Sequence, residues 1–270
     1  MNKSYDILVA AGDSHTAGAE MEYSYQSVCY EKAWPRHLAK ILKIPKSCNL
    51  AFSGYGNAAI FRTVQSWVIE NVLINKLFKP ENIVFTIMWS GFDRVEIYIP
   101  ENNKLVNISP SYKVGPEFTK ELKERMEMRL KFEVLNHNNL TVDFINLQYV
   151  VNLERWLSSL GIENHHSNGI QGFPGSNYLP EAYLDHKLRA DYNNLLELYT
   201  RRKYHHSFLN HKNVFYHYYL DHKDFKFTKF AKNQHFDEET HKDYAERMYR
   251  FWFTTEMYKE KQQQYSSNIC

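Results

Sequence analysis

Short apolar segments alternate with amphipathic patterns in the first third of the chain. Residues 7–11 and 83–89 are continuous apolar runs, and a third, shorter strand is expected at residues 48–52. Runs of this length and composition are typical of strands that are buried on both faces of a parallel sheet. Apolar residues recur at helical spacing between these runs, at residues 34–42 and 58–78. This order of strands and helices predicts an α/β protein with a central parallel sheet.

The alternation is less regular after residue 90. A polar strand pair or loop is expected between residues 95 and 108, followed by a charged helix at 117–135 and a helix whose apolar stripe runs from 142 to 160. Residues 164–180 are rich in Gly, Asn, His and Pro, and we interpret them as a long surface loop. The remaining pattern predicts a helix at 184–199, a strand at 214–220 and a final helix at 237–258.

The composition fits one globular domain over residues 1–270, with insertions at about 94–140 and 164–180. With 43% hydrophobic and 16% aromatic residues, the chain can bury a large core. Its net charge of +2, with both signs interspersed, argues against a nucleic-acid or membrane-surface partner. No signal-peptide core and no apolar stretch long enough to cross a bilayer are found, so we expect a soluble cytoplasmic or virion-associated protein.

No metal or other cofactor is expected. The three cysteines lack metal-type spacing and imply no disulfide framework. Several of the 13 histidines cluster at 165–166 and 205–211, but no His-x-x-x-His pair with a nearby acid occurs there. We therefore expect these clustered histidines to face solvent.

A serine follows the first strand directly, in the sequence GDSHTAG of residues 12–18. The two glycines permit tight turns, and the carboxyl end of a strand is where open α/β sheets bind ligands. Ser14 is therefore a candidate nucleophile, and its alternative use is to cap a helix. A nucleophile needs a base, and His235 stands in the loop just before the final helix, for which Asp237 is a credible N-cap. His241 lies on the apolar stripe of that helix, and we expect it to be a packed core histidine.

Three short blocks of the sequence resemble the SGNH, or GDSL-type, esterase and acylhydrolase superfamily. They are GDS at residues 12–14, Asn49 with SGYGN at 53–57, and HFDEETH at 235–241. The resemblance implies a three-layer, flavodoxin-like α/β sandwich of the SGNH-hydrolase type. It also implies that Ser14 is the nucleophile, that the glycine of the second block, Gly54, supplies an oxyanion N–H, and that His235 is the catalytic base.

The chain departs from the family pattern at two positions. Phe92 stands where the third block, Gly-x-Asn-Asp, has its asparagine. Asn57 is a candidate substitute as the side-chain oxyanion donor, and its alternative use is as the N-cap of the helix that follows. Asn233 replaces the acid that normally precedes the catalytic histidine. An asparagine can orient the imidazole by a hydrogen bond, but it does not stabilise the imidazolium as a carboxylate does. Asp221, Asp224 or Asp237 could take the place of the acid in space, and a Ser–His dyad is the further alternative.

Ser90 and Arg94, just past the strand at 83–89, are expected to line the same cleft. Arg94 could bind an anionic or sugar substrate, although a surface salt bridge to Glu96 is the favoured use. The sequence thus predicts a serine esterase for a small-molecule or carbohydrate ester, with no nucleic-acid or membrane partner. The alternative is a weakly active or inactive SGNH-fold binding or structural module, for example in a viral particle. Substrate and oligomeric state stay open.

Overall fold

The computed structural model describes residues 4–19, 21, 28–92, 94–99, 104–108, 119–136, 140–169, 190, 194 and 235–254. The strand expected at 214–220 and all but two residues of the helix expected at 184–199 lie outside this set, as does the candidate site residue Asn233.

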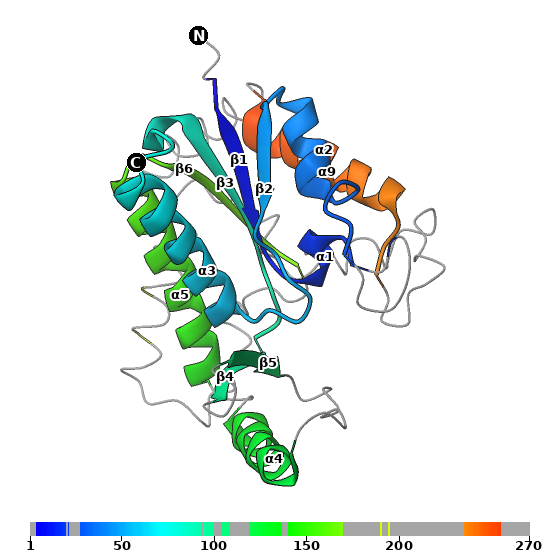
Figure 1. Cartoon of the computed structure of the whole chain (residues 1–270), viewed down its shortest axis with the longest axis vertical. Helices are drawn as coiled ribbons and strands as arrows, with labels where there is room; N and C mark the ends of the chain where they lie inside the picture. Colours follow the sequence, from blue (N-terminus) through cyan, green and yellow to red (C-terminus); the bar gives the residue numbers. More distant parts are fainter. Residues whose placement is uncertain are drawn as a thin grey trace.

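Four parallel strands form the central sheet in the order β2-β1-β3-β6 (Figure 1). They are β1 (Ile7–Ala11), β2 (Lys46–Asn49), β3 (Ile83–Trp89) and β6 (Glu163–Asn168). The first two strands in sequence lie on one side of β3 and β6 on the other, so the connections reverse direction between β1 and β3. This is the flavodoxin-like strand order of doubly wound α/β folds.

Helices cover both faces of the sheet, which confirms the predicted three-layer α/β sandwich (Figure 1). One face packs against α3 (Asn57–Val68) and α5 (Leu140–Ser159). Helix α3 continues as a π-helix at Ile69–Ile74. The other face packs against α2 (Trp34–Ile41) and α9 (Glu238–Phe253). Every residue of β1 and β3 is buried, because apolar side chains from both faces enter one of these two cores.

The polar segment after residue 94 is a strand pair. Strands β4 (Val95–Ile99) and β5 (Lys104–Ile108) pair antiparallel as a separate two-stranded sheet, and α4 (Lys120–Asn136) follows. Figure 1 shows the hairpin at the end of the central sheet where the strands have their carboxyl termini. The hairpin therefore lies at the edge where a doubly wound sheet binds ligands.

Several boundaries differ from those predicted, and the final helix ends at Phe253, before residue 258. The second strand begins and ends earlier, at Lys46–Asn49, and the long helix after it ends at Ile74, before residue 78. The larger error concerns residues 164–168, which form most of β6 where a surface loop was expected. His166 is buried there, not solvent-facing, because Trp89 Nε1 donates to its Nδ1 (3.0 Å) and its Nε2 contacts Asn164 Oδ1 (2.8 Å).

Candidate active site

The carboxyl ends of β1 and β3 meet at the point where the strand connections reverse. The short helix α1 (Ser14–Ala17) starts just beyond β1, and Ser90 follows β3 directly. The crevice outside this point is the usual ligand site of an open α/β sheet. Two of the candidate residues, Ser14 and Ser90, thus lie at this edge of the sheet.

The carboxylate of Asp13 joins these segments. One oxygen accepts the backbone N–H of His15 (3.0 Å) and caps α1, while the other accepts Ser90 Oγ (2.9 Å) and Arg94 Nη1 (3.1 Å). Asp13 is fully buried. Burial alone would raise the pKa of Asp13, but the Arg94 guanidinium and these hydrogen bonds hold it below the usual value. Asp13 therefore stays ionised and fixes the turn that carries Ser14.

The favoured prediction for Arg94 was wrong. Arg94 pairs with Asp13 and donates a second hydrogen bond from Nη1 to the Tyr55 carbonyl (3.1 Å). Glu96 is instead held by Arg62, with Nη2 to Oε1 at 2.6 Å. Arg94 thus ties the glycine loop to the serine turn. No local pattern indicated this contact, because Arg94 and Asp13 are far apart in the sequence.

Ser14 is the first residue of α1 and retains only 6% of its accessible surface. The N-cap of this helix is Asp13, so the alternative reading of Ser14 as the cap was wrong. The backbone oxygen of Ser14 accepts the N–H groups of Gly18 and Ala19, which closes the helix after one turn. Ser14 is consequently held by backbone contacts on both sides.

His235 lies next to this turn. Its ring centroid is 5.1 Å from that of His15, the residue after Ser14, and the Phe236 ring is 6.1 Å from His15. Both His15 and His235 are buried. Burial lowers the pKa of His15 to about 3, which makes His15 a poor base at neutral pH.

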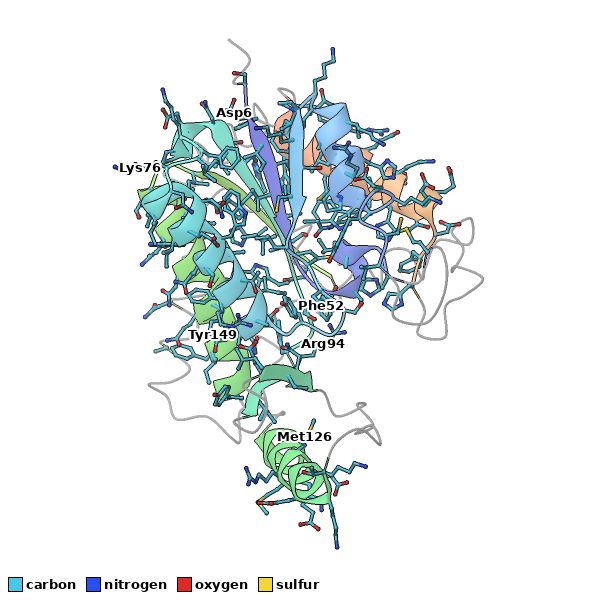
Figure 2. The ribbon with its side chains drawn as sticks, viewed as in Figure 1. Asp6, Phe52, Lys76, Arg94, Met126 and Tyr149 are labelled. Atoms are coloured by element: carbon cyan, nitrogen blue, oxygen red, sulfur yellow. The ribbon has the colours of Figure 1, made fainter. Side chains whose placement is uncertain are left out.

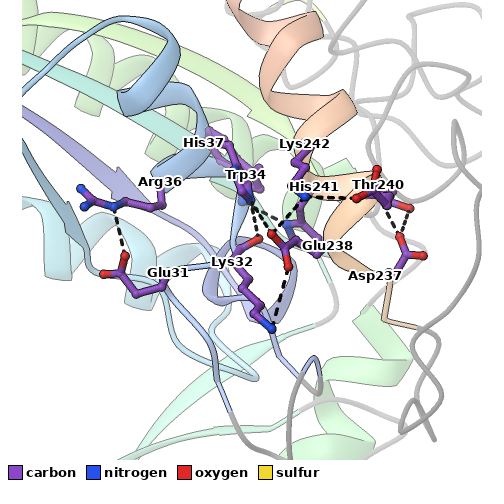
Figure 3. Close-up of polar contacts among 11 residues, drawn as sticks. Glu31, Lys32, Trp34, Arg36, His37, Asp237, Glu238, Thr240, His241 and Lys242 are labelled. Atoms are coloured by element: carbon purple, nitrogen blue, oxygen red, sulfur yellow. Dashed lines mark hydrogen bonds and ion pairs between the residues drawn. The ribbon is translucent and has the colours of Figure 1, made fainter.

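The start of α9 is anchored firmly, and this fixes the segment that contains His235 (Figure 3). Asp237 caps the helix as predicted, accepting Thr240 N (2.9 Å) and Thr240 Oγ1 (2.8 Å). His241 is the predicted core histidine, and its Nδ1 accepts the backbone N–H of Trp34 at the start of α2 (3.1 Å). Glu238 pairs with Lys32 (3.8 Å) and Lys242 (3.2 Å) around this contact.

The glycine loop supplies the remaining candidates. Gly54 has a φ of +87°, a conformation that favours glycine. A Cβ on Gly56 would lie 2.7 Å from the Arg94 carbonyl oxygen, so only glycine permits this close approach. On the preceding segment, Asn49 Nδ2 donates to the Thr16 carbonyl (2.8 Å), which links the second block of the sequence to α1.

Asn57 has neither of its predicted roles. The N-cap of α3 is Gly56, and no side chain caps this helix. The Asn57 amide instead donates to Asn146 Oδ1 (2.8 Å) and the Ser90 carbonyl (3.3 Å), and its oxygen accepts Ser90 N–H (2.7 Å). Both amide hydrogens are therefore used to hold the end of β3, and neither is left for an oxyanion.

Sequence reasoning missed three polar side chains at this edge of the sheet. Within the described residues, Thr16 Oγ1, Ser53 Oγ and both amide atoms of Asn168 are buried without a hydrogen-bond partner. Asn168 ends β6, and Gly169 N–H next to it donates to the Trp89 carbonyl (2.7 Å). A buried polar group without a partner is destabilising, which is why such atoms gather at sites that receive water or a ligand. The polar composition of residues 164–168 concealed Asn168, because it suggested a loop.

Because three histidines are buried, we expect the free energy of unfolding to fall in acid. Burial lowers the pKa of His15 and His166 to about 3 and that of His241 well below its usual value. The unfolded chain therefore binds protons below about pH 6.5 that the folded chain does not, and each histidine should reduce the free energy of unfolding by about 1.4 kcal/mol per pH unit. Urea unfolding between pH 7.5 and 5 measures this slope.

The variant His241→Asn provides the matched control for the acid dependence. An asparagine oxygen can still accept the Trp34 N–H but does not titrate. The slope should fall by about 1.4 kcal/mol per pH unit in this variant. An unchanged slope would show that His241 is not a source of the acid sensitivity.

The described residues contain no group of three or more His, Cys, Asp or Glu side chains that could hold a metal ion. Likewise, no helix among them has the length and apolar character needed to span a membrane.

The fold and site define an α/β protein with a capped serine turn and a histidine at the carboxyl edge of its sheet. The model of one protein family matches residues 19–174, more than half of the chain. The chain therefore belongs to this family of unknown function, DUF6071. No curated protein matches the sequence.

Solved structures that match this chain include three of low sequence identity. A member of the lipolytic protein G-D-S-L family from Veillonella parvula DSM 2008 is 13% identical, with a TM-score of 0.43 over 91% of this chain and 97% of that one. Phospholipase A1 from Streptomyces albidoflavus NA297 is 12% identical, with a TM-score of 0.42 over 92% and 100%. A carbohydrate esterase described as having divergent catalytic and non-catalytic binding functions is 15% identical, with a TM-score of 0.28 over 75% and 66%.

Proposed function

We propose that this chain is a serine ester hydrolase that cleaves a small ester through an acyl-enzyme. Ser14 is the nucleophile and His235 the general base. The observation that carries this proposal is the approach of the His235 ring to 5.1 Å from the ring of His15, the neighbour of Ser14. It brings a titratable side chain from the far end of the sequence to the serine turn, as nucleophilic catalysis requires.

The reaction follows from these groups. His235 takes the proton of Ser14 Oγ as the oxygen attacks the ester carbonyl, and the backbone N–H groups of Ser14 and Gly54 bind the oxyanion. His235 then returns the proton to the leaving alcohol, and water cleaves the acyl-enzyme by the same route. Asn233, outside the described residues, is the proposed partner of the other ring nitrogen. The whole machinery belongs to one proposed domain over residues 1–270.

The rate should be modest. The amide of Asn57 is committed to Asn146 and Ser90, and buried Phe92 stands at the third-block asparagine position. Each lost oxyanion donor lowers kcat by roughly 100- to 1,000-fold. The same observation favours the second candidate function, an inactive binding or structural module of this fold.

Hydrolysis of p-nitrophenyl acetate separates the two candidates. The native protein should release p-nitrophenol well above the buffer rate, and Ser14→Ala should lower the rate to that of buffer. Ser159→Ala, which changes an exposed serine at the end of α5, should leave the rate unchanged. A folded native protein with no activity above buffer would support the inactive module.

A further inference from the structure

An exposed aromatic side chain borders the serine turn. Phe52 follows β2, and its backbone N–H donates to the carbonyl of Gly12 (3.3 Å), two residues before Ser14. Its side chain nevertheless remains 55% exposed, while the preceding Ala51 is buried. Figure 2 shows Phe52 and Arg94 together at the carboxyl end of the sheet. The ring therefore faces solvent from a backbone position that is fixed beside the candidate nucleophile.

Tyr55 extends this surface. Its ring is half-buried, lies 5.5 Å from that of Phe52 and is tilted by 42°, so the two rings are neighbours on this surface. We call Phe52 and Tyr55 the aromatic platform. The Tyr55 carbonyl is held by Arg94 (3.1 Å), and Tyr30 OH donates to the Ala51 carbonyl from the other side (3.1 Å). The backbone that carries the platform is thus held at both ends, which lowers the entropic cost of positioning it for a ligand.

The surroundings of the platform indicate a neutral ligand with hydroxyl groups. The described cations beside the loop are already paired, Arg94 with Asp13 and Arg62 with Glu96. Ser53, between Phe52 and Gly54, has a buried hydroxyl without a partner in the described part of the chain. An alkyl chain offers this hydroxyl no hydrogen bond, whereas a sugar does.

We propose that the aromatic platform binds the pyranose ring of an esterified carbohydrate. The C–H face of a pyranose is apolar and weakly positive, and it stacks on the negative face of an aromatic ring. Its hydroxyls radiate from the edge of the ring, and the Ser53 hydroxyl meets one of them by rotating out of its buried position. The platform is joined through Gly12 to the serine turn, so a sugar bound there carries its ester group toward Ser14. This inference rests on the proposed function and names its substrate class.

Binding to the Ser14→Ala protein tests the platform without turnover. The dissociation constants of methyl 6-O-acetyl-β-D-glucopyranoside and n-butyl acetate are measured by NMR titration. Phe52→Ala should weaken the sugar ester about five- to tenfold and butyl acetate less than twofold. Phe52→Trp should restore sugar binding, and Phe52→Leu should not. Leu77→Ala is the control, because Leu77 is also well exposed (63%) and lies just after the π-helix at Ile69–Ile74, away from the carboxyl edge of the sheet; it should leave both constants unchanged.

Several outcomes would overturn the platform. One is that the sugar ester does not bind measurably. Another is that Phe52→Ala and Leu77→Ala weaken sugar binding equally. A third is that Phe52→Ala weakens butyl acetate as much as the sugar ester, which would indicate an acyl-chain site. The proposed esterase function and the aromatic platform can be tested independently of each other. If the native protein hydrolyses p-nitrophenyl acetate but Phe52→Ala binds the sugar ester normally, only the platform is wrong. If hydrolysis is absent while Phe52→Ala loses sugar binding, the platform stands and the esterase does not.

Discussion

Replacing Arg94 with methionine is expected to lower the free energy of unfolding at pH 7 by about 3–5 kcal/mol. The guanidinium is the charged partner of Asp13 at 3.1 Å, and Asp13 is fully buried. Without Arg94 the carboxylate keeps only the hydrogen bonds from Ser90 and His15, so it is left as a buried charge without a counterion. Urea unfolding of Arg94→Met and the native protein measures the loss.

A matched ion pair on the surface provides the control. Arg250 Nη2 also lies 3.1 Å from its partner, Glu246 Oε2, but both side chains are more than half exposed. Arg250→Met should therefore cost less than about 1 kcal/mol. The double variant Asp13→Asn with Arg94→Met should recover part of the loss, because it removes the buried charge. Equal losses in Arg94→Met and Arg250→Met would show that burial does not set the strength of the Asp13–Arg94 pair.

Replacing His235 with glutamine should lower kcat/KM for p-nitrophenyl acetate by about 1,000-fold, within the range expected for loss of a general base. Glutamine keeps polarity and approximate size but does not accept a proton near neutral pH. The kinetic constants and the thermal midpoint are measured together. A fall in rate with an unchanged midpoint assigns the effect to proton transfer.

His241→Asn serves as the kinetic control for His235. His241 is also a buried histidine of the same segment, and its ring accepts the Trp34 N–H. Its substitution should change kcat/KM less than about threefold, since His241 is proposed to do no chemistry. If the two variants lose activity equally, His235 acts only through the packing of this segment.

The strands that the sequence predicted correctly are those whose own residues favour a buried sheet. Residues 7–11 are apolar throughout and residues 83–89 are apolar except for Thr86, and β1 and β3 have these bounds. The hairpin at residues 95–108 and the N-cap Asp237 also follow from local sequence. In each of these elements the local pattern and the tertiary environment favour the same structure.

Strand β6 could not be predicted from the sequence, because its residues, ENHHSN, are polar and its stability comes from distant partners. Tyr244 OH donates to Ser167 Oγ (3.0 Å), and the His165 ring stacks on Trp252 at 5.0 Å. Together with the Trp89–His166 hydrogen bond, these contacts satisfy polar groups inside the sandwich. Each depends on a residue from another part of the chain, so no local periodicity indicates it.

The candidate site likewise contains residues that local sequence identified and residues whose contacts depend on the fold. The block GDS and its position after a strand identified the serine turn from local sequence. The predicted Arg94–Glu96 pair and the predicted N-cap role of Asn57 were wrong, because both side chains bond across the carboxyl edge of the sheet. Arg94 bonds to Asp13, and Asn57 bonds to Ser90 and Asn146. A carboxylate nearby in sequence, such as Glu96, does not identify the partner of Arg94, and a helix start at residue 57 does not identify the role of Asn57. The fold decides both.

Labelling by a fluorophosphonate tests most directly the central claim that Ser14 is an activated nucleophile. The native protein is incubated with the probe, digested and mapped by mass spectrometry. We expect one phosphonate adduct, on Ser14, which disappears in Ser14→Ala and forms much more slowly in His235→Gln. A folded native protein that carries no adduct, or an adduct on another serine that persists in Ser14→Ala, would contradict the claim.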